Sequence, residues 1–276
     1  MFENIIGQET NKKFLHESVI NDKISHAYLF VGQKGIGKYQ IAKEFAKDIL
    51  KTDNLDTCPD YKYISKKEDK KDIIIEQIRK ELIDDVYFAP IASDKKVYII
   101  DDAQLLNIAS QNALLKTLEE PPEYVVIILV SSSISSFLPT IISRVDIVNF
   151  NNIENEKVKE FINSKYNINF DENILAFVDG SLGQAINIIQ NSLQDEFINL
   201  NKVFEYIKNK DVIGVFKLIE SIKFNDNTLD YLEFLLYSNQ YILCTKFVER
   251  AKNRLKMNGN YDIVVDNMIL NIIDNI

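Results

Sequence analysis

The sequence contains the stretch Gly32-Gln33-Lys34-Gly35-Ile36-Gly37-Lys38, which fits the pattern G-x-x-x-x-G-K of phosphate-binding loops. The apolar run 26–31 precedes it and predicts a buried strand, while residues 38–50 have apolar side chains at helical spacing. In this context glycines let backbone N–H groups face an anion at a helix N-terminus, and the lysine reaches the terminal phosphates. The residues expected to form the loop are Gly32, Gly35, Gly37 and Lys38. The alternative is a glycine-rich turn that never meets phosphate.

The position after this lysine is unusual for such a loop. Ser or Thr is expected there because its hydroxyl binds Mg²⁺, but this sequence has Tyr39. A phenol oxygen cannot lie where a β-hydroxyl would, and the ring can crowd the phosphate site. We therefore expect the loop to keep its shape and to lose much of its metal-dependent chemistry.

Two acidic residues follow the apolar run 97–100, which predicts a second buried strand. Asp101 is expected in the Mg²⁺ shell of such a site, and Asp102 at the position of the base that orients the attacking water. Glu is usual at the second position, so Asp102 is one methylene short. The alternative is that the two acids only cap the next helix.

Strand and helix patterns alternate through the first 150 residues, and only helical spacing continues after them. The expected strands are 26–31, 97–100, 125–130 and 145–150, the expected helices are 9–19, 38–50, 74–83 and 109–118, and 51–71 is expected to be a loop. This alternation predicts an α/β fold with a parallel sheet covered by helices on both faces. Helical segments are expected over residues 151–190 and 191–276.

Composition and charge limit where the protein can act and what it can bind. The 276 residues are 46% hydrophobic and carry a formal net charge of −9, which disfavours binding of nucleic acid by this chain alone. The longest apolar run, Val125–Val130, is far shorter than the roughly 20 residues of a membrane span. Residues 1–9 do not resemble a signal or transit peptide, so we expect a cytoplasmic protein without a membrane partner.

Cysteine and histidine are too scarce for a metal centre. The two cysteines, Cys58 and Cys244, and the two histidines, His16 and His26, do not group in the sequence. Isolated cysteines in a chain of this kind are usually small buried or surface residues rather than a disulfide or a metal pair. We therefore expect no metal site built from thiols and imidazoles.

Four segments together resemble the clamp-loader subunits of the AAA+ superfamily, most closely those of the delta-prime type in bacterial DNA polymerase III. The segments are 25–39, 97–103, 111–122 (Q-N-A-L-L-K-T-L-E-E-P-P) and 138–144 (L-P-T-I-I-S-R). The last two strings are more diagnostic than a phosphate-binding loop. The resemblance covers residues 1 to about 190. It implies a P-loop AAA+ domain over 1–150, a helical lid over 151–190 and an all-α oligomerisation collar over 191–276.

A serine and an arginine in the last of these segments match a signature of this family. Ser143 and Arg144 fit its Ser-Arg-Cys pattern, with Val145 in place of the cysteine. The resemblance implies that Arg144, with Ser143 beside it, is a catalytic residue in trans that reaches the γ-phosphate of ATP held by a neighbouring subunit. Such an arginine finger stabilises the charge that spreads over the transferring phosphoryl oxygens. The alternative is a surface arginine in an ordinary ion pair.

Other positions depart from the family. Its second sensor is an arginine, but the matching segment 180–185 has Gly183 there, and Ser131–Ser133 in the first-sensor region is not distinctive. Its zinc module needs four cysteines, of which only Cys58 is present, so zinc binding is not carried over. Gly183, Tyr39 and Asp102 are three departures in one catalytic apparatus, and they imply an inert site.

The resemblance and these departures imply a largely non-hydrolysing clamp-loader subunit of the DNA polymerase III holoenzyme, active in DNA replication. Its implied partners are the delta and gamma/tau subunits and, through the complex, the beta sliding clamp and primed DNA. No cofactor is required, and we expect binding of ATP or ADP to be weak.

Three alternatives stay open. Intact Lys38 and Asp101 allow an active AAA+ ATPase, either a gamma/tau-like motor or a Holliday-junction helicase motor, although Tyr39 and Gly183 disfavour it. Lys38 also allows a module that binds nucleotide without turnover. The third alternative is a non-replicative adaptor.

Overall fold

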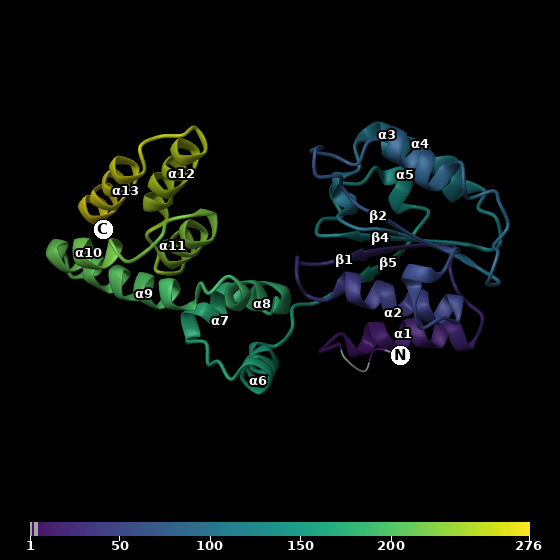
Figure 1. Ribbon diagram of the computed structural model, residues 1–276, viewed down its shortest axis with the longest axis horizontal. Coiled ribbons are helices and arrows are strands. Elements are labelled where there is room, and N and C mark those ends of the chain that lie inside the picture. Colours follow the sequence, from purple (N-terminus) through teal and green to yellow (C-terminus); the bar gives the residue numbers. More distant parts are fainter. Residues whose placement is uncertain (1, 3–4) are drawn as a thin grey trace. The chain divides into compact units, whose positions relative to one another are not determined.

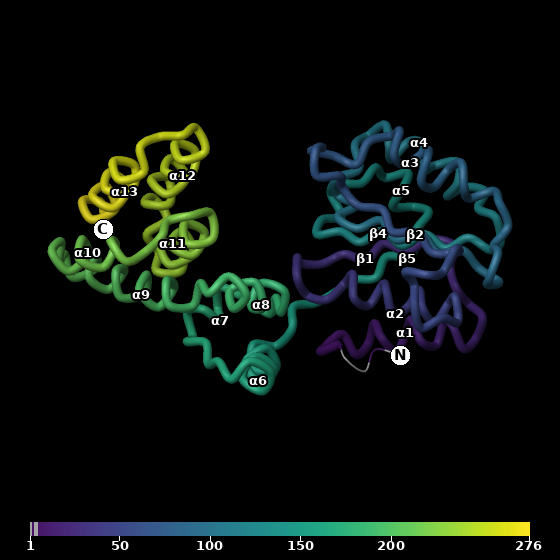
Figure 2. Tube along the Cα trace, viewed as in Figure 1, coloured from purple at the N-terminus to yellow at the C-terminus, as the bar shows by residue number. Residues whose placement is uncertain are grey.

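The computed structural model describes residue 2 and residues 5–276. The chain, traced in Figures 1 and 2, divides into two compact units. The first comprises Met1–Val158 together with Gly180–Gly183, and the second comprises Lys159–Asp179 and Gln184–Ile276. Because residues 180–183 belong to the first unit, they can contribute to a site that is built there.

A five-stranded parallel sheet forms the centre of the first unit, which confirms the predicted α/β fold. The strand order is β2-β3-β4-β1-β5. The strands are β1 (Ala27–Val31), β2 (Tyr61–Ile64), β3 (Lys96–Ile100), β4 (Val125–Ser131) and β5 (Asp146–Asn149). Figure 1 shows α1 (Glu9–Ile20) and α2 (Lys38–Leu50) on one face and α3 (Ile75–Ile78), α4 (Ile108–Glu119) and α5 (Pro139–Ile142) on the other.

The apolar runs of the central strands are buried on both faces of the sheet. All seven residues of β4 are buried. Ile128 belongs to the same core as Phe45 of α2, whereas Ile127 belongs to the opposite core with Leu114 of α4. Successive side chains of a strand point to opposite faces, so a continuous apolar run serves two cores at once.

One predicted loop contains a strand. Tyr61–Ile64, within the segment 51–71, forms β2 at the edge of the sheet and pairs with Val97–Ile100 of β3. The prediction was wrong because the strand is short, lies among polar residues and is half-exposed: Ile64 is buried, but Tyr63 is 44% exposed. An edge strand needs a partner on only one side, so this weak pattern suffices.

After β5, the described residues form helices joined by short connections, and no strand. The helices are α6 (Asn155–Tyr166), α7 (Glu172–Val178), α8 (Leu182–Gln190), α9 (Gln194–Lys208), α10 (Val212–Ile219), α11 (Asp226–Ser238), α12 (Ile242–Lys256) and α13 (Tyr261–Asn275). The core of the second unit includes the Phe197 ring stacked on Tyr231 at 4.1 Å, with the Tyr231 hydroxyl donating to Asn201.

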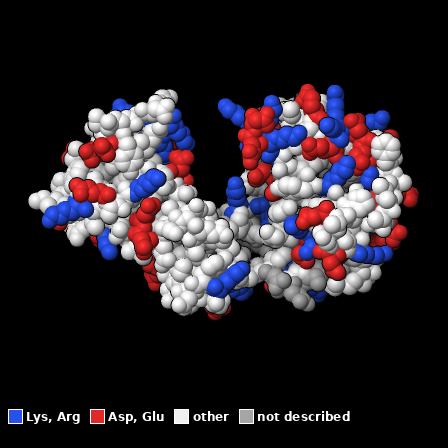
Figure 3. Space-filling view, in the orientation of Figure 1, with Lys and Arg blue, Asp and Glu red and all other residues white. Residues whose placement is uncertain are grey.

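Within residue 2 and residues 5–276, the helices lack the combination of length and apolar character that a membrane crossing requires. On the face shown in Figure 3, acidic and basic side chains are interspersed over the first unit.

A buried carboxylate fixes the loop that leads into β3. Asp60 is 1% exposed and accepts hydrogen bonds from the backbone N–H groups of Ile91, Ala92 and Ser93 at 2.7 to 2.8 Å. Burial opposes the charge of Asp60, but these N–H groups lower its pKa below the usual value. The loop therefore depends on an ionised acid.

We expect Asp60→Asn to lower the free energy of unfolding by about 2 kcal/mol at pH 7, because an amide cannot accept all three hydrogen bonds. The pKa of Asp60 is lower in the folded chain than in the unfolded chain, where it is about 4. Ionised Asp60 therefore stabilises the fold fully above the unfolded pKa, and this stabilisation is lost as pH falls through the folded pKa. Urea titrations at several pH values measure this difference. Asp69→Asn, at an exposed position, is the control. If Asp60→Asn lowers the free energy of unfolding by the same amount at about pH 2.5 as at pH 7, the stabilisation does not come from the charge of Asp60.

Candidate nucleotide site

The glycine-rich loop lies where the sequence predicts, between the carboxyl end of β1 and the first turn of α2. Gly37 precedes the helix with φ of 92°, and a Cβ at Gly32 would lie 2.5 Å from the carbonyl oxygen of Phe150. Both positions therefore require glycine. The first N–H groups of a helix have no acceptor within the helix, so the start of α2 and its dipole favour an anion at this loop.

Lys38 is held by the loop itself. It is 6% exposed, and its Nζ donates hydrogen bonds to the carbonyl oxygens of Gly32 (2.7 Å) and Gln33 (2.6 Å). Burial lowers the pKa of Lys38 to about 8, although the charges of Asp101 and Asp102 act to raise it. A phosphate that binds Lys38 must therefore compete with two carbonyl oxygens, and the amine loses its charge at mildly alkaline pH.

A tyrosine contacts the acid that was predicted to hold a metal, and a second tyrosine packs on the first. The ring of Tyr39 lies 5.2 Å from the ring of Tyr63, whose hydroxyl donates to Asp101 Oδ2 at 3.3 Å. The other oxygen, Asp101 Oδ1, accepts the N–H of Asp102 at 3.0 Å. Burial also raises the pKa of Asp101, which weakens it as a cation ligand. The loop fits a phosphate group, whereas these side chains do not fit a Mg²⁺ shell.

A glutamine connects Asp102 with the end of β4. Gln104 Nε2 donates to Asp102 Oδ1 at 2.8 Å. Its Oε1 accepts hydrogen bonds from Ser131 Oγ (3.0 Å) and from the Ser132 N–H (3.1 Å). Asp102 was predicted as a site residue and the serines were considered not distinctive, whereas Gln104, which joins them, carries no motif that could have indicated it.

Residues 180–183 lie directly against the glycine-rich loop. Ser181 Oγ donates to the carbonyl oxygen of Lys34, and the N–H of Gly183 donates to that of Gly35, both at 2.8 Å. A Cβ at Gly183 would lie 2.8 Å from the Cα of Gly35. Position 183 thus has glycine in place of the sensor arginine, and the nearby backbone of Gly35 leaves no space for a side chain there.

Among the described residues, the side-chain contacts of Arg144 involve α4 and α5 rather than the glycine-rich loop. It follows α5, and its guanidinium pairs with Glu119 at the end of α4, with Nη2 at 2.8 Å from Oε1. Nη1 donates to the carbonyl oxygen of Thr140 (2.9 Å) and to Ser143 Oγ (3.0 Å). The predicted pair Ser143 and Arg144 is therefore in contact, and the Arg144 side chain stays 33% exposed.

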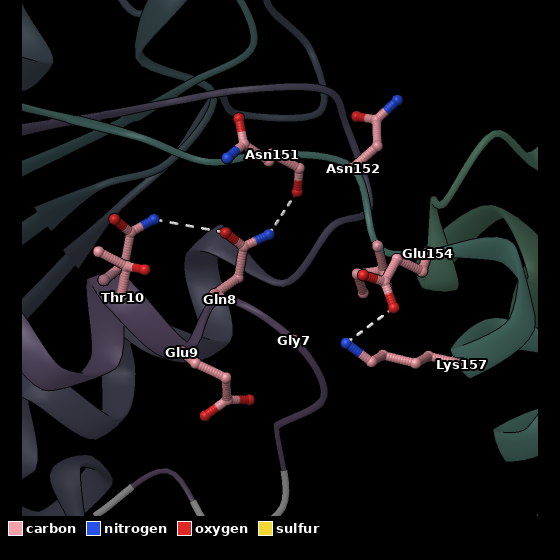
Figure 4. Close-up of a pocket in the computed structure, with 10 residues that line it drawn as sticks. Gly7, Gln8, Glu9, Thr10, Asn151, Asn152, Glu154 and Lys157 are labelled. Atoms are coloured by element: carbon pink, nitrogen blue, oxygen red, sulfur yellow. Dashed lines mark hydrogen bonds and ion pairs between the residues drawn. The ribbon is translucent and has the colours of Figure 1, made fainter.

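A polar pocket of about 200 Å³ lies between the start of α1 and the segment after β5 (Figure 4). Gln8 donates to the carbonyl oxygen of Asn151, and Lys157 pairs with Glu154 at 2.9 Å. The other lining residues are Gly7, Glu9, Thr10, Asn11, Asn152 and Ile153. No sequence motif indicated this pocket, and its lining residues do not include those of the glycine-rich loop.

Comparison with known proteins gives a consistent family. Residues 7–154, more than half of the chain, match the family described as "DNA polymerase III, delta subunit". The gamma subunit of DNA polymerase III from Buchnera aphidicola (subsp. Acyrthosiphon pisum) is 33% identical over 234 residues, which are 78% of this chain and 63% of that protein. The tau subunit from Bacillus subtilis is 33% identical over 70% of this chain and 38% of its own length. The chain thus spans less than two thirds of these relatives.

Solved structures share the fold. A DNA polymerase III gamma subunit-related protein from Thermotoga maritima matches with a TM-score of 0.58 at 18% identity, over 97% of this chain and 98% of that one. A variant of RuvB from Thermotoga maritima matches with a TM-score of 0.50 at 16% identity, over 84% and 75% of the two chains. Likeness at this identity shows a shared fold and not a shared activity.

The lowered pKa of Lys38 predicts pH-dependent anion binding. We expect the affinity of the isolated chain for ADP to fall roughly ten-fold between pH 7 and pH 9, because the amine is mostly neutral above its pKa of about 8. Equilibrium dialysis with labelled ADP measures this. Lys38→Met should bind more weakly and without this pH dependence, and the same profile in both proteins would contradict the assignment.

The close approach of Gly183 to Gly35 predicts an unusual effect of alanine. Replacing glycine by alanine within a helix ordinarily stabilises by about 1 kcal/mol. We expect Gly183→Ala, in the first turn of α8, instead to lower the free energy of unfolding by about 1–3 kcal/mol, because the methyl group meets backbone. Ser181→Ala should lower the free energy of unfolding by about 1 kcal/mol, because the hydrogen bond to the Lys34 carbonyl oxygen is lost. Denaturation followed by circular dichroism tests both, and a stabilised Gly183→Ala would refute the contact.

Proposed function

Because the chain belongs to the DNA polymerase III delta subunit family of clamp-loader AAA+ proteins, we propose that it acts as a subunit of the delta-prime type. In this role it hydrolyses little ATP itself and supplies Arg144 to the ATP site of a neighbouring subunit. The complex would then load the sliding clamp onto primed DNA during replication.

The observation that carries this proposal is a contrast between two parts of the first unit. In its own site, Tyr39 packs on Tyr63, Tyr63 bonds to Asp101, and Gly183 lies against Gly35. Arg144, by contrast, is oriented by side-chain and backbone partners and is partly exposed. A chain whose own site lacks the metal-binding hydroxyl and the sensor arginine, and whose finger arginine is accessible, is better suited to complete another site than to run its own.

The chemistry of an arginine finger explains why one residue suffices. Phosphoryl transfer places charge on the equatorial oxygens of the transferring group, and a planar cation that donates several N–H bonds stabilises that charge. Arg144 needs no metal and no base of its own for this task. We assign to the glycine-rich loop at most weak binding of ATP or ADP, which the function does not require.

The proposed partners follow from the same assignment. They are the gamma/tau subunit that holds ATP, the delta subunit and, through the complex, the beta clamp and primed DNA. A net charge of −9 and interspersed surface charges (Figure 3) favour DNA contact by the assembled complex over contact by this chain alone.

A gamma/tau-like motor is the second candidate. The relatives compared above are gamma and tau subunits, and the sequence retains Lys38 and Asp101. This candidate requires that Tyr39 and Tyr63 leave room for a metal beside Asp101. Hydrolysis by the isolated chain separates the two candidates.

The decisive test combines the isolated chain with a reconstituted complex whose other ATP sites are inactivated. We expect the isolated chain to be silent, and Arg144→Ala to reduce hydrolysis at the adjoining site by at least about 100-fold. Steady-state ATPase assays with clamp and primed DNA measure this. Arg79→Ala, at another exposed arginine of the first unit, is the control. Robust hydrolysis by the isolated chain would favour the motor, and full activity of Arg144→Ala would refute the finger.

A further inference from the structure

Three contacts orient the guanidinium group of Arg144. Nη1 donates to the carbonyl oxygen of Thr140 and to Ser143 Oγ, so both of its N–H groups are used. Nη2 pairs with Glu119 Oε1 at 2.8 Å. Guanidinium has five N–H donors, and within the described part of the chain Nε–H and the second N–H of Nη2 are left for another acceptor. The group is thus held in place and still able to bind an anion.

The backbone around Glu119 is fixed as well. Glu119 is the last residue of α4, which ends just before Pro121-Pro122. On the same helix, Gln111 is 3% exposed and binds the segment that enters α5, donating to the carbonyl oxygen of Ser136 (2.9 Å) and accepting the N–H of Leu138 (2.9 Å). This bridge sets the position of α5 against α4, and it therefore sets the distance between Glu119 and Arg144.

We propose that Glu119 is a positioning residue for Arg144: its carboxylate holds the guanidinium so that the unused N–H donors face a phosphate of the neighbouring subunit's nucleotide. This inference rests on the proposed function, because it assigns Arg144 to that nucleotide. A long side chain that is already oriented loses less freedom when it engages the phosphate, and this lowers the barrier to transfer.

Exposure separates this role from a structural one. The side chains of Glu119 and Arg144 are 49% and 33% exposed, and ion pairs of such exposure add little to stability. Substitution of Glu119 should therefore leave the fold intact. Any change in the rate of the complex then reports on the orientation of Arg144. Glu120 is an adjacent exposed acid without an ion pair among the described residues, so it offers a matched control.

The experiment compares Glu119→Gln, Glu120→Gln, Arg144→Ala and the double variant Glu119→Gln with Arg144→Ala in the reconstituted complex. We expect Glu119→Gln to lower kcat roughly five-fold while KM for ATP stays within about two-fold, because the charge that orients the finger is lost. Glu120→Gln should match the unmodified complex. In the Arg144→Ala background, Glu119→Gln should have no further effect.

Each other outcome overturns the inference in a distinct way. If Arg144→Ala abolishes activity but Glu119→Gln matches Glu120→Gln, the positioning role fails and the proposed function stands. If Glu119→Gln lowers kcat equally with and without Arg144, Glu119 acts through another group. If Arg144→Ala itself is fully active, the proposed function and this inference fall together.

Discussion

The parallel hydrogen bonding of β1 to both β4 and β5 is the constraint on which the whole site depends. Val31, the last residue of β1, lies opposite Ser131 of β4 and Asn149 of β5. Because the carboxyl ends of parallel strands meet at one edge, the glycine-rich loop, Asp101 and the residues after β5 gather there from distant parts of the chain. The approach of Gly32 to the Phe150 carbonyl follows directly from this pairing.

The two sequence strings that carry the family resemblance also depend on each other physically. The first forms α4, and the second forms α5 and the residues after it. Gln111 binds the backbone at Ser136 and Leu138, and Glu119 binds Arg144. Each of these two polar residues of the first string has a partner in or beside the second string. Their diagnostic value thus reflects one packed unit that presents an arginine at a fixed place.

Local patterns predicted most of the fold, and long-range partners escaped prediction. The buried strands and their helices followed from apolar runs and helical spacing, whereas β2 was missed because an edge strand can be short and half-exposed. The loop, Asp101 and Arg144 could be predicted as site residues because each lies in a recognisable motif. Tyr63, Gln104 and Glu119 were not assigned roles, since their importance arises only from the side chains that the fold brings beside them.

The glycine-rich loop has a structural use that does not require catalysis. Gly32 and Gly37 are demanded by close backbone and by a positive φ, and the carbonyl oxygens of Lys34 and Gly35 bind residues 180–183. Replacing these glycines would therefore disturb the first unit even if no nucleotide ever bound. The structural role of the loop needs neither a hydroxyl at position 39 nor an arginine at position 183. Hence the intact motif is weak evidence for hydrolysis. The residue types at positions 39 and 183 discriminate better between a motor and a subunit that assists one.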